Sequence, residues 1–154
     1  MGAEAGFIAL RSGIATGAEA IMIPELKNQT QNLKKVLEEG FKRKKSSNII
    51  IVAEGDEEGG AFKIAEKVKN DFKDYSVRVT VLGHIQRGGS PTVFDRVTAS
   101  RLGYAAVEAL LDDQKSVMVG LQNGEVVLVP FRKAVKLNKD VNRQLLEIAD
   151  ILSL

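Results

Sequence analysis

The sequence contains no cysteine and no tryptophan, and it has a single histidine and three prolines in 154 residues. Without cysteine, a disulfide framework, thiolate chemistry and a Cys/His zinc site are all excluded. Lys and Arg number 22 against 20 Asp and Glu, so the net charge of +2 gives no general electrostatic reason to expect a nucleic acid or membrane partner. The longest apolar runs are far shorter than the roughly 18 residues of a membrane-spanning helix.

The composition that remains, 44% hydrophobic and 27% charged, is that of an ordinary soluble globular chain. Its length fits one domain or one half of a larger protein. The N-terminus has no basic stretch and does not resemble a signal peptide. No capping residue precedes the apolar run at 6–10, so we expect the sequence to begin inside a helix and to be part of a longer protein.

Short β-like runs alternate with helical stretches along most of the chain. The pattern predicts helices over 4–16, 61–72 and 92–112, a helix capped by Thr30 that carries Leu33 to Phe41, a last helix capped by Asp140, and strands over 20–23, 48–53 and 77–82. The strand at 48–53 is apolar on both faces, which is typical of a parallel sheet covered by helices. The sequence therefore predicts an α/β fold, a doubly wound, Rossmann-like parallel sheet with helices on both faces.

Two features depart from this alternation after about residue 112. The runs at 117–121 and 125–129 are joined by a turn containing Asn123 and Gly124, which is a strong hairpin signal. The helix over 92–112 is apolar around much of its circumference, so it needs burial on more than one side. We expect this chain to supply too few partners for it.

The strongest candidate site lies at 83–91, between a predicted strand and the long helix. Gly88 and Gly89 allow close approach of a ligand, and Ser90 or Thr92 can cap a helix whose N-terminus favours an anion. His84 and Arg87 add a hydrogen-bonding ring and a planar cation. Arg78 should lie on the same strand face as His84.

Together these groups suit a phosphate monoester. The residues alone leave a plain alternative equally open, a glycine-rich turn with a capping serine and solvated arginines.

Two further segments are weaker candidates. Glu54 ends the strand at 48–53 and is placed to accept hydrogen bonds from sugar hydroxyls or to coordinate a divalent cation. We expect the acidic residues 56–58 to favour the following helix N-terminus and to face water. The basic run 42–45 is more often a solvated helix end than an anion site.

No GxGxxG fingerprint follows a strand, there is no Walker A lysine, and no nucleophile or general base is evident, so no catalytic residue and no metal site are expected in this chain.

The run TVLGHIQRGGSP from Thr80 to Pro91, followed by FDRVTASRLG from Phe94 to Gly103, closely resembles bacterial-type 6-phosphofructokinases. The similarity extends to Met1 and Gly2, to IPE at 23–25, to VAE at 52–54 and to GLQN at 120–123. The whole chain resembles the C-terminal half of that family. The resemblance implies phosphoryl transfer from ATP, or from pyrophosphate, to the 1-hydroxyl of fructose 6-phosphate. It also implies that the nucleotide site and the catalytic aspartate belong to an N-terminal half outside this sequence.

Position by position, the resemblance implies a substrate site made of Met1, Gly2, Glu54, Arg78, His84 and Arg87. Glu54 would bind sugar hydroxyls, and His84 and Arg87 would bind the phosphate. Arg78 would cross a subunit interface to a neighbouring substrate. Ala3 departs from the family's Met-Gly-Arg motif, so that position supplies no guanidinium.

The resemblance also implies an effector site, at Gly17, Glu19, Arg43 and Lys45. Ser46 and Ser47 stand where some members have basic residues, which weakens that expectation. The implied sugar-phosphate domain comprises 1–86 and 140–154, and 87–139 would pack into the nucleotide domain.

We further expect a cytoplasmic homo-oligomer, a dimer or tetramer, that uses Mg²⁺ with the phosphoryl donor only in the intact enzyme, with no cofactor bound by this chain alone. Two other readings remain open: a stand-alone sugar-phosphate or anion-binding module, and a purely structural interaction domain.

Overall fold

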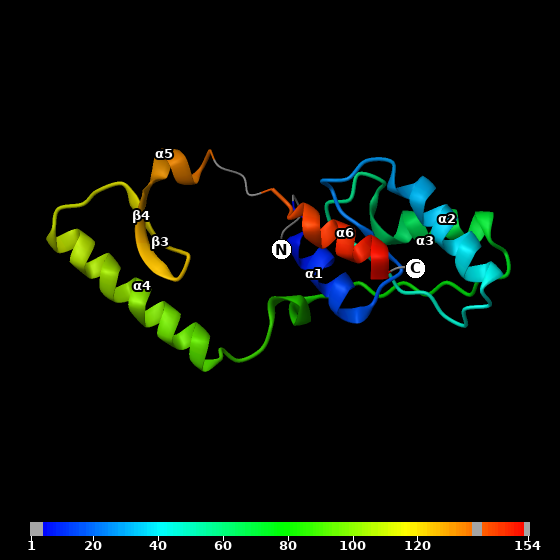
Figure 1. The fold of residues 1–154 in the computed structure, drawn as a ribbon, viewed down its shortest axis with the longest axis horizontal. Coiled ribbons are helices and arrows are strands. Elements are labelled where there is room, and N and C mark those ends of the chain that lie inside the picture. Colours follow the sequence, from blue (N-terminus) through cyan, green and yellow to red (C-terminus); the bar gives the residue numbers. More distant parts are fainter. Residues whose placement is uncertain (1–4, 137–139, 153–154) are drawn as a thin grey trace. The chain divides into compact units, whose positions relative to one another are not determined.

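The computed structural model describes residues 5–136 and 140–152 and divides into two compact units (Figure 1). One unit runs to Gly83 and resumes at Val141, and the other runs from His84 to Asp140. The first holds a parallel β-pair between helices. The second holds a long helix and a β-hairpin.

The first unit is an α/β sandwich, as the sequence predicts. Its elements are α1 (Phe7–Thr16), β1 (Ala20–Met22), α2 (Gln29–Lys42), β2 (Ile50–Val52), α3 (Gly60–Asp71) and α6 (Arg143–Leu152). β1 and β2 pair in parallel, with Ala20 opposite Ile50 and Met22 opposite Val52. α1 and α6 lie side by side over one face of this pair, and α2 and α3 cover the other (Figure 1).

The alternation of side chains along the two strands creates two separate cores. Met22 packs with Leu33 and Leu37 of α2 and with Ile64 and Val68 of α3. The neighbouring residues point the other way and pack against α1 and α6; the buried members of that cluster are Ala9, Leu10, Ile23, Ala53 and Val141. The strands are thus buried on both faces, which explains their continuous apolar sequence.

α1 approaches β1 closely because it carries glycine where the two meet. A Cβ built on Gly13 would overlap the Cδ1 and Cγ1 atoms of Ile21, so a larger residue there would force the Ile21 side chain to move. Gly17 then ends the helix in the left-handed conformation at φ 64°, and the N–H of Ala18 donates to the carbonyl of Gly13. The end of this helix was predictable from the glycine alone.

The predicted strand at 77–82 is wrong. Val77 packs at the margin of the α2–α3 core, but Val81 and Leu82 are 69% and 64% exposed, and no strand is assigned to 77–82. β-branched residues favour an extended backbone, but a strand also needs a neighbouring backbone for its hydrogen bonds. No segment in the described part of the chain supplies one.

Two predicted helix caps are also wrong. Asn28, at φ 58°, precedes α2, and Thr30 lies inside the first turn without a capping bond. The last helix begins at Arg143, where the N–H of Gln144 donates to Oδ1 of Asn142, so Asn142 rather than Asp140 satisfies the first turn.

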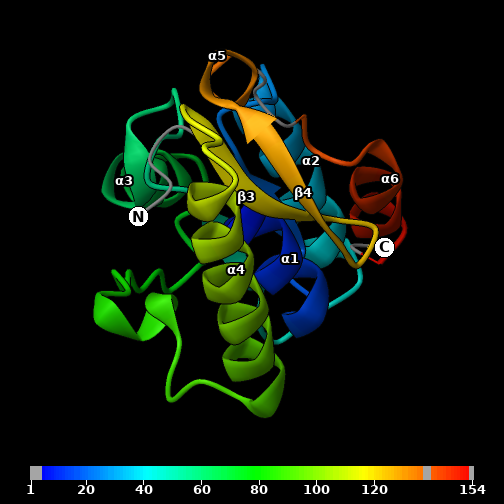
Figure 2. The same cartoon turned by 90° about the vertical axis from the view of Figure 1, so that its left-hand side faces the viewer.

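The second unit contains η1 (His84–Arg87), α4 (Val93–Leu111), β3 (Val117–Gln122), β4 (Glu125–Pro130) and the short α5 (Phe131–Ala134). The predicted hairpin is confirmed: β3 and β4 pair antiparallel from Val117 opposite Pro130 to Gln122 opposite Glu125. Both turn residues have positive φ, 53° at Asn123 and 84° at Gly124, as a type I′ turn requires. α4 runs along this hairpin, and Arg101 donates to the carbonyl of Gly124 (Figure 2).

Candidate functional site

The glycine-rich loop carries His84 and Arg87 on one turn. η1 is a single 3₁₀ turn, and residues three apart in such a turn eclipse one another. His84 and Arg87 therefore project from the same side of η1, and both are exposed. Gly88 follows at φ 102°, with its N–H donated to the carbonyl of Ile85. The resulting pair, a ring nitrogen and a guanidinium on one turn, suits the oxygens of a phosphate monoester.

The N-terminus of α4 is already occupied by a carboxylate of the chain itself. Thr92 caps the helix by accepting the N–H of Asp95, and the Asp95 carboxylate accepts both the N–H and the hydroxyl of Thr92, at 2.8 and 2.7 Å. These bonds from Thr92 hold the pKa of Asp95 below its ordinary value. The first turn of α4 is therefore capped from within the chain, by Thr92 and Asp95.

The other expected substrate residues belong to the first unit or lie outside the described residues. Glu54 is exposed and directly follows Ala53, whose N–H donates to the carbonyl of Met22 at the end of β1. Arg78 is exposed on the extended segment that leaves the α2–α3 core. Of the expected substrate residues that are described, Glu54 and Arg78 thus belong to the first unit, and His84 and Arg87 belong to the second.

Met1 and Gly2 lie outside the described residues. The first described turn after them is tied down at Gly6, whose N–H donates to both carboxylate oxygens of Glu25, at 2.9 and 3.1 Å. A carboxylate at this position also complements the N-terminal end of α1. Glu25, which follows β1 by three residues, thus fixes where the chain enters the first helix.

The acidic turn after β2 does not all face water, contrary to the sequence prediction. Glu57 is exposed, but Asp56 is only 6% exposed. Burial raises the pKa of the Asp56 carboxyl above its ordinary value, against the hydrogen bond that it accepts from the N–H of Glu58. Glu58 pairs with Lys67 of α3, and the hydrogen bond from that ammonium lowers the pKa of Glu58.

The contribution of Asp56 to stability should fall as the pH rises, whereas that of a carboxylate with a lowered pKa would increase. A raised folded-state pKa contributes stability that is complete below the ordinary value of 3.8 and is lost as the pH rises through the folded-state pKa. We expect the free energy of unfolding of the native chain, relative to Asp56→Asn, to fall across this window, by at most about 1.4 kcal/mol per pH unit because one proton is involved. Urea unfolding at a series of pH values measures the difference. A flat difference, or one that rises with pH, would contradict the buried environment of Asp56.

The four expected effector residues lie around the α1–β1 and α2–β2 connections. Glu19 accepts the N–H of Ile49 at 2.6 Å, and its other oxygen lies 3.8 Å from Nζ of Lys45. Gly17 ends α1 two residues before Glu19, and Arg43 ends α2 two residues before Lys45. The structure thus brings Glu19 and Lys45 into one ion pair.

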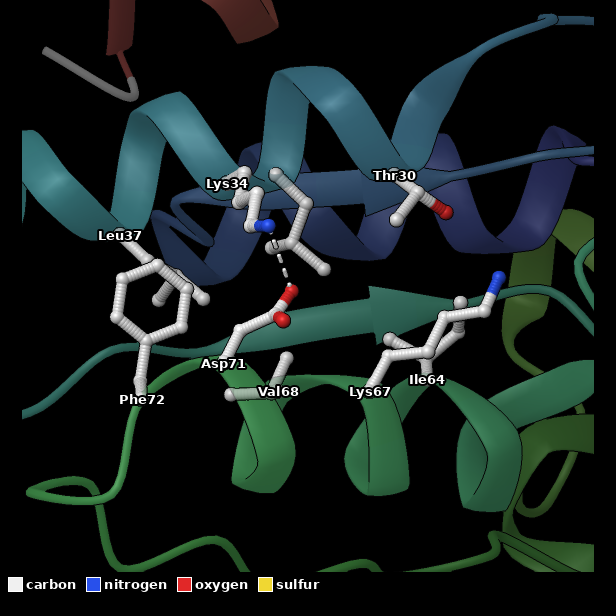
Figure 3. A pocket seen from close by; sticks show the side chains of 9 residues that line it. Thr30, Lys34, Leu37, Ile64, Lys67, Val68, Asp71 and Phe72 are labelled. Atoms are coloured by element: carbon white, nitrogen blue, oxygen red, sulfur yellow. Dashed lines mark ion pairs between the residues drawn. The ribbon is translucent and has the colours of Figure 1, made fainter.

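A narrow pocket lies between α2 and α3, and none of the predicted substrate or effector residues lines it. Figure 3 shows side chains from both helices lining it, with an ion pair of 3.0 Å between Lys34 of α2 and Asp71 of α3. Its volume of about 10 Å³ admits no more than a water molecule. A shallower hollow of about 260 Å³ lies beside the rings of Phe41, Phe72 and Tyr75.

Within the described residues, no three side chains of His, Asp or Glu gather closely enough to hold a metal ion. None of the described helices is long and apolar enough to cross a membrane.

Comparison with known proteins decides the family. The family model described as Phosphofructokinase matches residues 1–110 of the 154. This chain belongs to the phosphofructokinase family. It is 50% identical over its whole length to ATP-dependent 6-phosphofructokinase 2 of Bacteroides thetaiotaomicron and equally to ATP-dependent 6-phosphofructokinase 1 of Thermus thermophilus, covering 47% and 48% of those enzymes.

Among solved structures, Pichia pastoris phosphofructokinase in the T-state matches with a TM-score of 0.73 and 30% sequence identity. The match covers 96% of this chain and 18% of that one. The chain thus spans about half the length of the curated bacterial phosphofructokinases that it matches. The family and the α/β fold predicted from the sequence are both confirmed.

Sequence reasoning missed two polar residues near Glu54, namely Gln29 and Asp56, which are 8% and 6% exposed. Gln29 stands at the start of an amphipathic helix, where a polar residue is ordinary. Asp56 stands in an acidic run that resembles a solvated turn. No periodicity distinguishes either of them, so only the packing of the α2 N-terminus against the turn after β2 reveals them.

Proposed function

We propose that this chain is the fructose 6-phosphate-binding half of a 6-phosphofructokinase. The observation that carries this proposal is the position of His84 and Arg87, three residues apart on one exposed turn, within a chain that is 50% identical to ATP-dependent 6-phosphofructokinases. Arg87 would bind two phosphate oxygens through its planar fork, and His84 would donate a hydrogen bond to a third. Glu54 would accept hydrogen bonds from the sugar hydroxyls and orient the ring.

The remaining substrate contacts belong to the same proposal. Arg78 would reach the phosphate of a substrate in a neighbouring subunit, which requires a homo-oligomer. Met1 and Gly2 would contact the sugar. Residues 1–86 and 140–154 would form the sugar-phosphate domain, and 87–139 would pack into the nucleotide domain.

This chain would bind and orient the acceptor without performing the transfer. Phosphoryl transfer needs a metal-bound donor and a group that receives the proton of the attacking hydroxyl. We place these, with the ATP site and its Mg²⁺, in the other half of a cytoplasmic enzyme. An effector that bridges Gly17, Glu19, Arg43 and Lys45 would have to open the ion pair between Glu19 and Lys45.

Titration calorimetry of the 154-residue chain tests the binding proposal. Fructose 6-phosphate should bind more tightly than inorganic phosphate and more tightly than fructose, because the site would recognise both ends of the ligand. Equal affinity for inorganic phosphate and fructose 6-phosphate would identify a plain anion site. No heat of binding with any of the three ligands would favour a purely structural interaction domain. Either result would overturn the proposed function.

A further inference from the structure

The side-chain amide of Gln29 bonds the backbone where β1 ends, in the way that a neighbouring strand would. Its Oε1 accepts the N–H of Ile23 at 2.7 Å, and its Nε2 donates to the carbonyl of the same residue, also at 2.7 Å. Successive residues of a strand direct their peptide groups to opposite edges, and the carbonyl of Met22 already bonds Ala53 beyond β2. Gln29 therefore satisfies the peptide groups on the edge of β1 away from β2.

The same amide faces the turn that follows β2. Both hydrogens of Nε2 are given at 2.7 Å, to the carbonyls of Ile23 and Leu26, so the third acceptor, Oδ1 of Asp56 at 3.4 Å, is held by electrostatic attraction rather than by a full hydrogen bond. The contact is nonetheless buried on both sides. In a poorly hydrated environment, the amide dipole and the carboxylate attract each other more strongly than in water.

Asp56 in turn defines the shape of the turn. Its N–H donates to the carbonyl of Ala53 at 3.1 Å, its carbonyl accepts the N–H of Gly59 at 3.3 Å, and its Oδ2 accepts the N–H of Glu58 at 3.1 Å. Glu54 lies between Ala53 and Asp56. Its backbone is thus held on one side by β1 and on the other by a buried carboxylate that Gln29 faces.

We propose that Gln29 and Asp56 are positioning residues for Glu54. They fix the turn at 53–59 so that the Glu54 carboxylate is presented in one orientation to the sugar hydroxyls, without either residue touching the ligand. This inference rests on the proposed function. The gain lies in preorganisation, because a carboxylate on a mobile turn would lose conformational freedom when the sugar binds.

Two readouts test the proposal in the 154-residue chain. The first is the ¹⁵N order parameter of the turn, which needs no ligand. In Gln29→Ala and in Asp56→Ala, we expect the order parameters of the Glu54 and Gly55 amides to fall from about 0.85 to below about 0.6. The exposed neighbours provide matched controls, and Gln31→Ala and Glu57→Ala should leave these amides unchanged.

The second readout is the affinity for fructose 6-phosphate in a double-mutant cycle. Gln29→Ala should weaken binding about tenfold in the native background and should have no further effect in the Glu54→Ala background, because it acts through that carboxylate. An equal loss in both backgrounds would show a general structural role and would overturn the proposal. So would order parameters that stay at native values in the turn.

Asp56→Asn keeps the test decisive if either alanine variant fails to fold. Its single acceptor oxygen can serve Glu58 or Gln29 but not both, so a smaller loss of order and a smaller loss of affinity are expected. Native order in this variant would overturn the role of the carboxylate. If the native chain binds no fructose 6-phosphate, the proposed function and the substrate role of Glu54 fall together, while the order parameters still decide whether Gln29 and Asp56 hold the turn.

Discussion

Arg87→Ala should weaken the binding of fructose 6-phosphate by about a hundredfold. Arg87 is the last residue of the exposed 3₁₀ turn that begins at His84, and a charge-assisted bidentate contact with a phosphate is worth about 1.5–3 kcal/mol. Arg87→Lys should recover only part of the loss, because an ammonium cannot supply the two parallel donors. Titration calorimetry at constant ionic strength measures the affinity of the native chain and of both variants for fructose 6-phosphate.

The control for this prediction is Arg132→Ala. Arg132 is also an exposed arginine of the same unit, but it lies in α5, away from the glycine-rich loop in sequence. The control variant should bind fructose 6-phosphate as the native chain does. If both substitutions weaken binding equally, the effect reflects net charge alone and the loop has no specific role. If Arg87→Ala binds normally, the phosphate site lies elsewhere.

Much of the fold could be predicted because its signals are local. The left-handed glycine at position 17, the turn at Asn123 and Gly124, and the cap at Thr92 each act within a few residues. The strand at 77–82 failed for the opposite reason. Val77 to Leu82 have the residues of a strand, but pairing depends on a neighbouring backbone that the local sequence does not describe.

The candidate site likewise has one part with a local sequence signal and one part that depends on contacts between distant segments. The residues of the loop alone leave a phosphate site and a plain glycine-rich turn equally open, and the substrate roles of His84 and Arg87 are implied by the family resemblance. The structure adds that both residues lie on one exposed 3₁₀ turn. The sequence assigns Asp56 to solvent, because three consecutive acidic residues resemble a charged helix start. Burial of that carboxylate follows from contact between the start of α2 and the turn after β2, which are far apart in sequence. Periodicity carries no information about such a contact.

The long helix α4 has two apolar faces, and only one of them is covered. Small residues, among them Ala109 at 7% exposure, lie on one side. At 3.6 residues per turn, Val93, Val97, Tyr104, Val107 and Leu111 lie within about 40° of a common direction on the opposite side. All five are more than half exposed. An apolar stripe of this kind on a helix that already packs against a hairpin is typical of an interface.

We propose that this stripe packs against the N-terminal half of a phosphofructokinase, since the chain spans about half the length of the curated enzymes it matches. The chain alone should form no fructose 1,6-bisphosphate, and it should scatter light as a particle larger than a monomer at micromolar concentration. Co-expression with the N-terminal half of the Thermus thermophilus relative should yield a soluble heterocomplex with phosphofructokinase activity. The gain from no activity to measurable activity is the largest effect expected here.

Substitutions on the stripe distinguish a specific interface from nonspecific hydrophobic association. Val97→Lys with Val107→Lys should abolish complex formation and activity, because two ammonium groups would be buried without partners. It should also reduce self-association of the chain alone. Lys115→Glu with Lys133→Glu changes the net charge by four units, against two for the stripe variant, at exposed positions off α4, and it should leave the heterocomplex intact. A complex that survives the stripe substitutions would place the interface elsewhere. Product formation by the native chain alone would contradict the division of labour between the two halves.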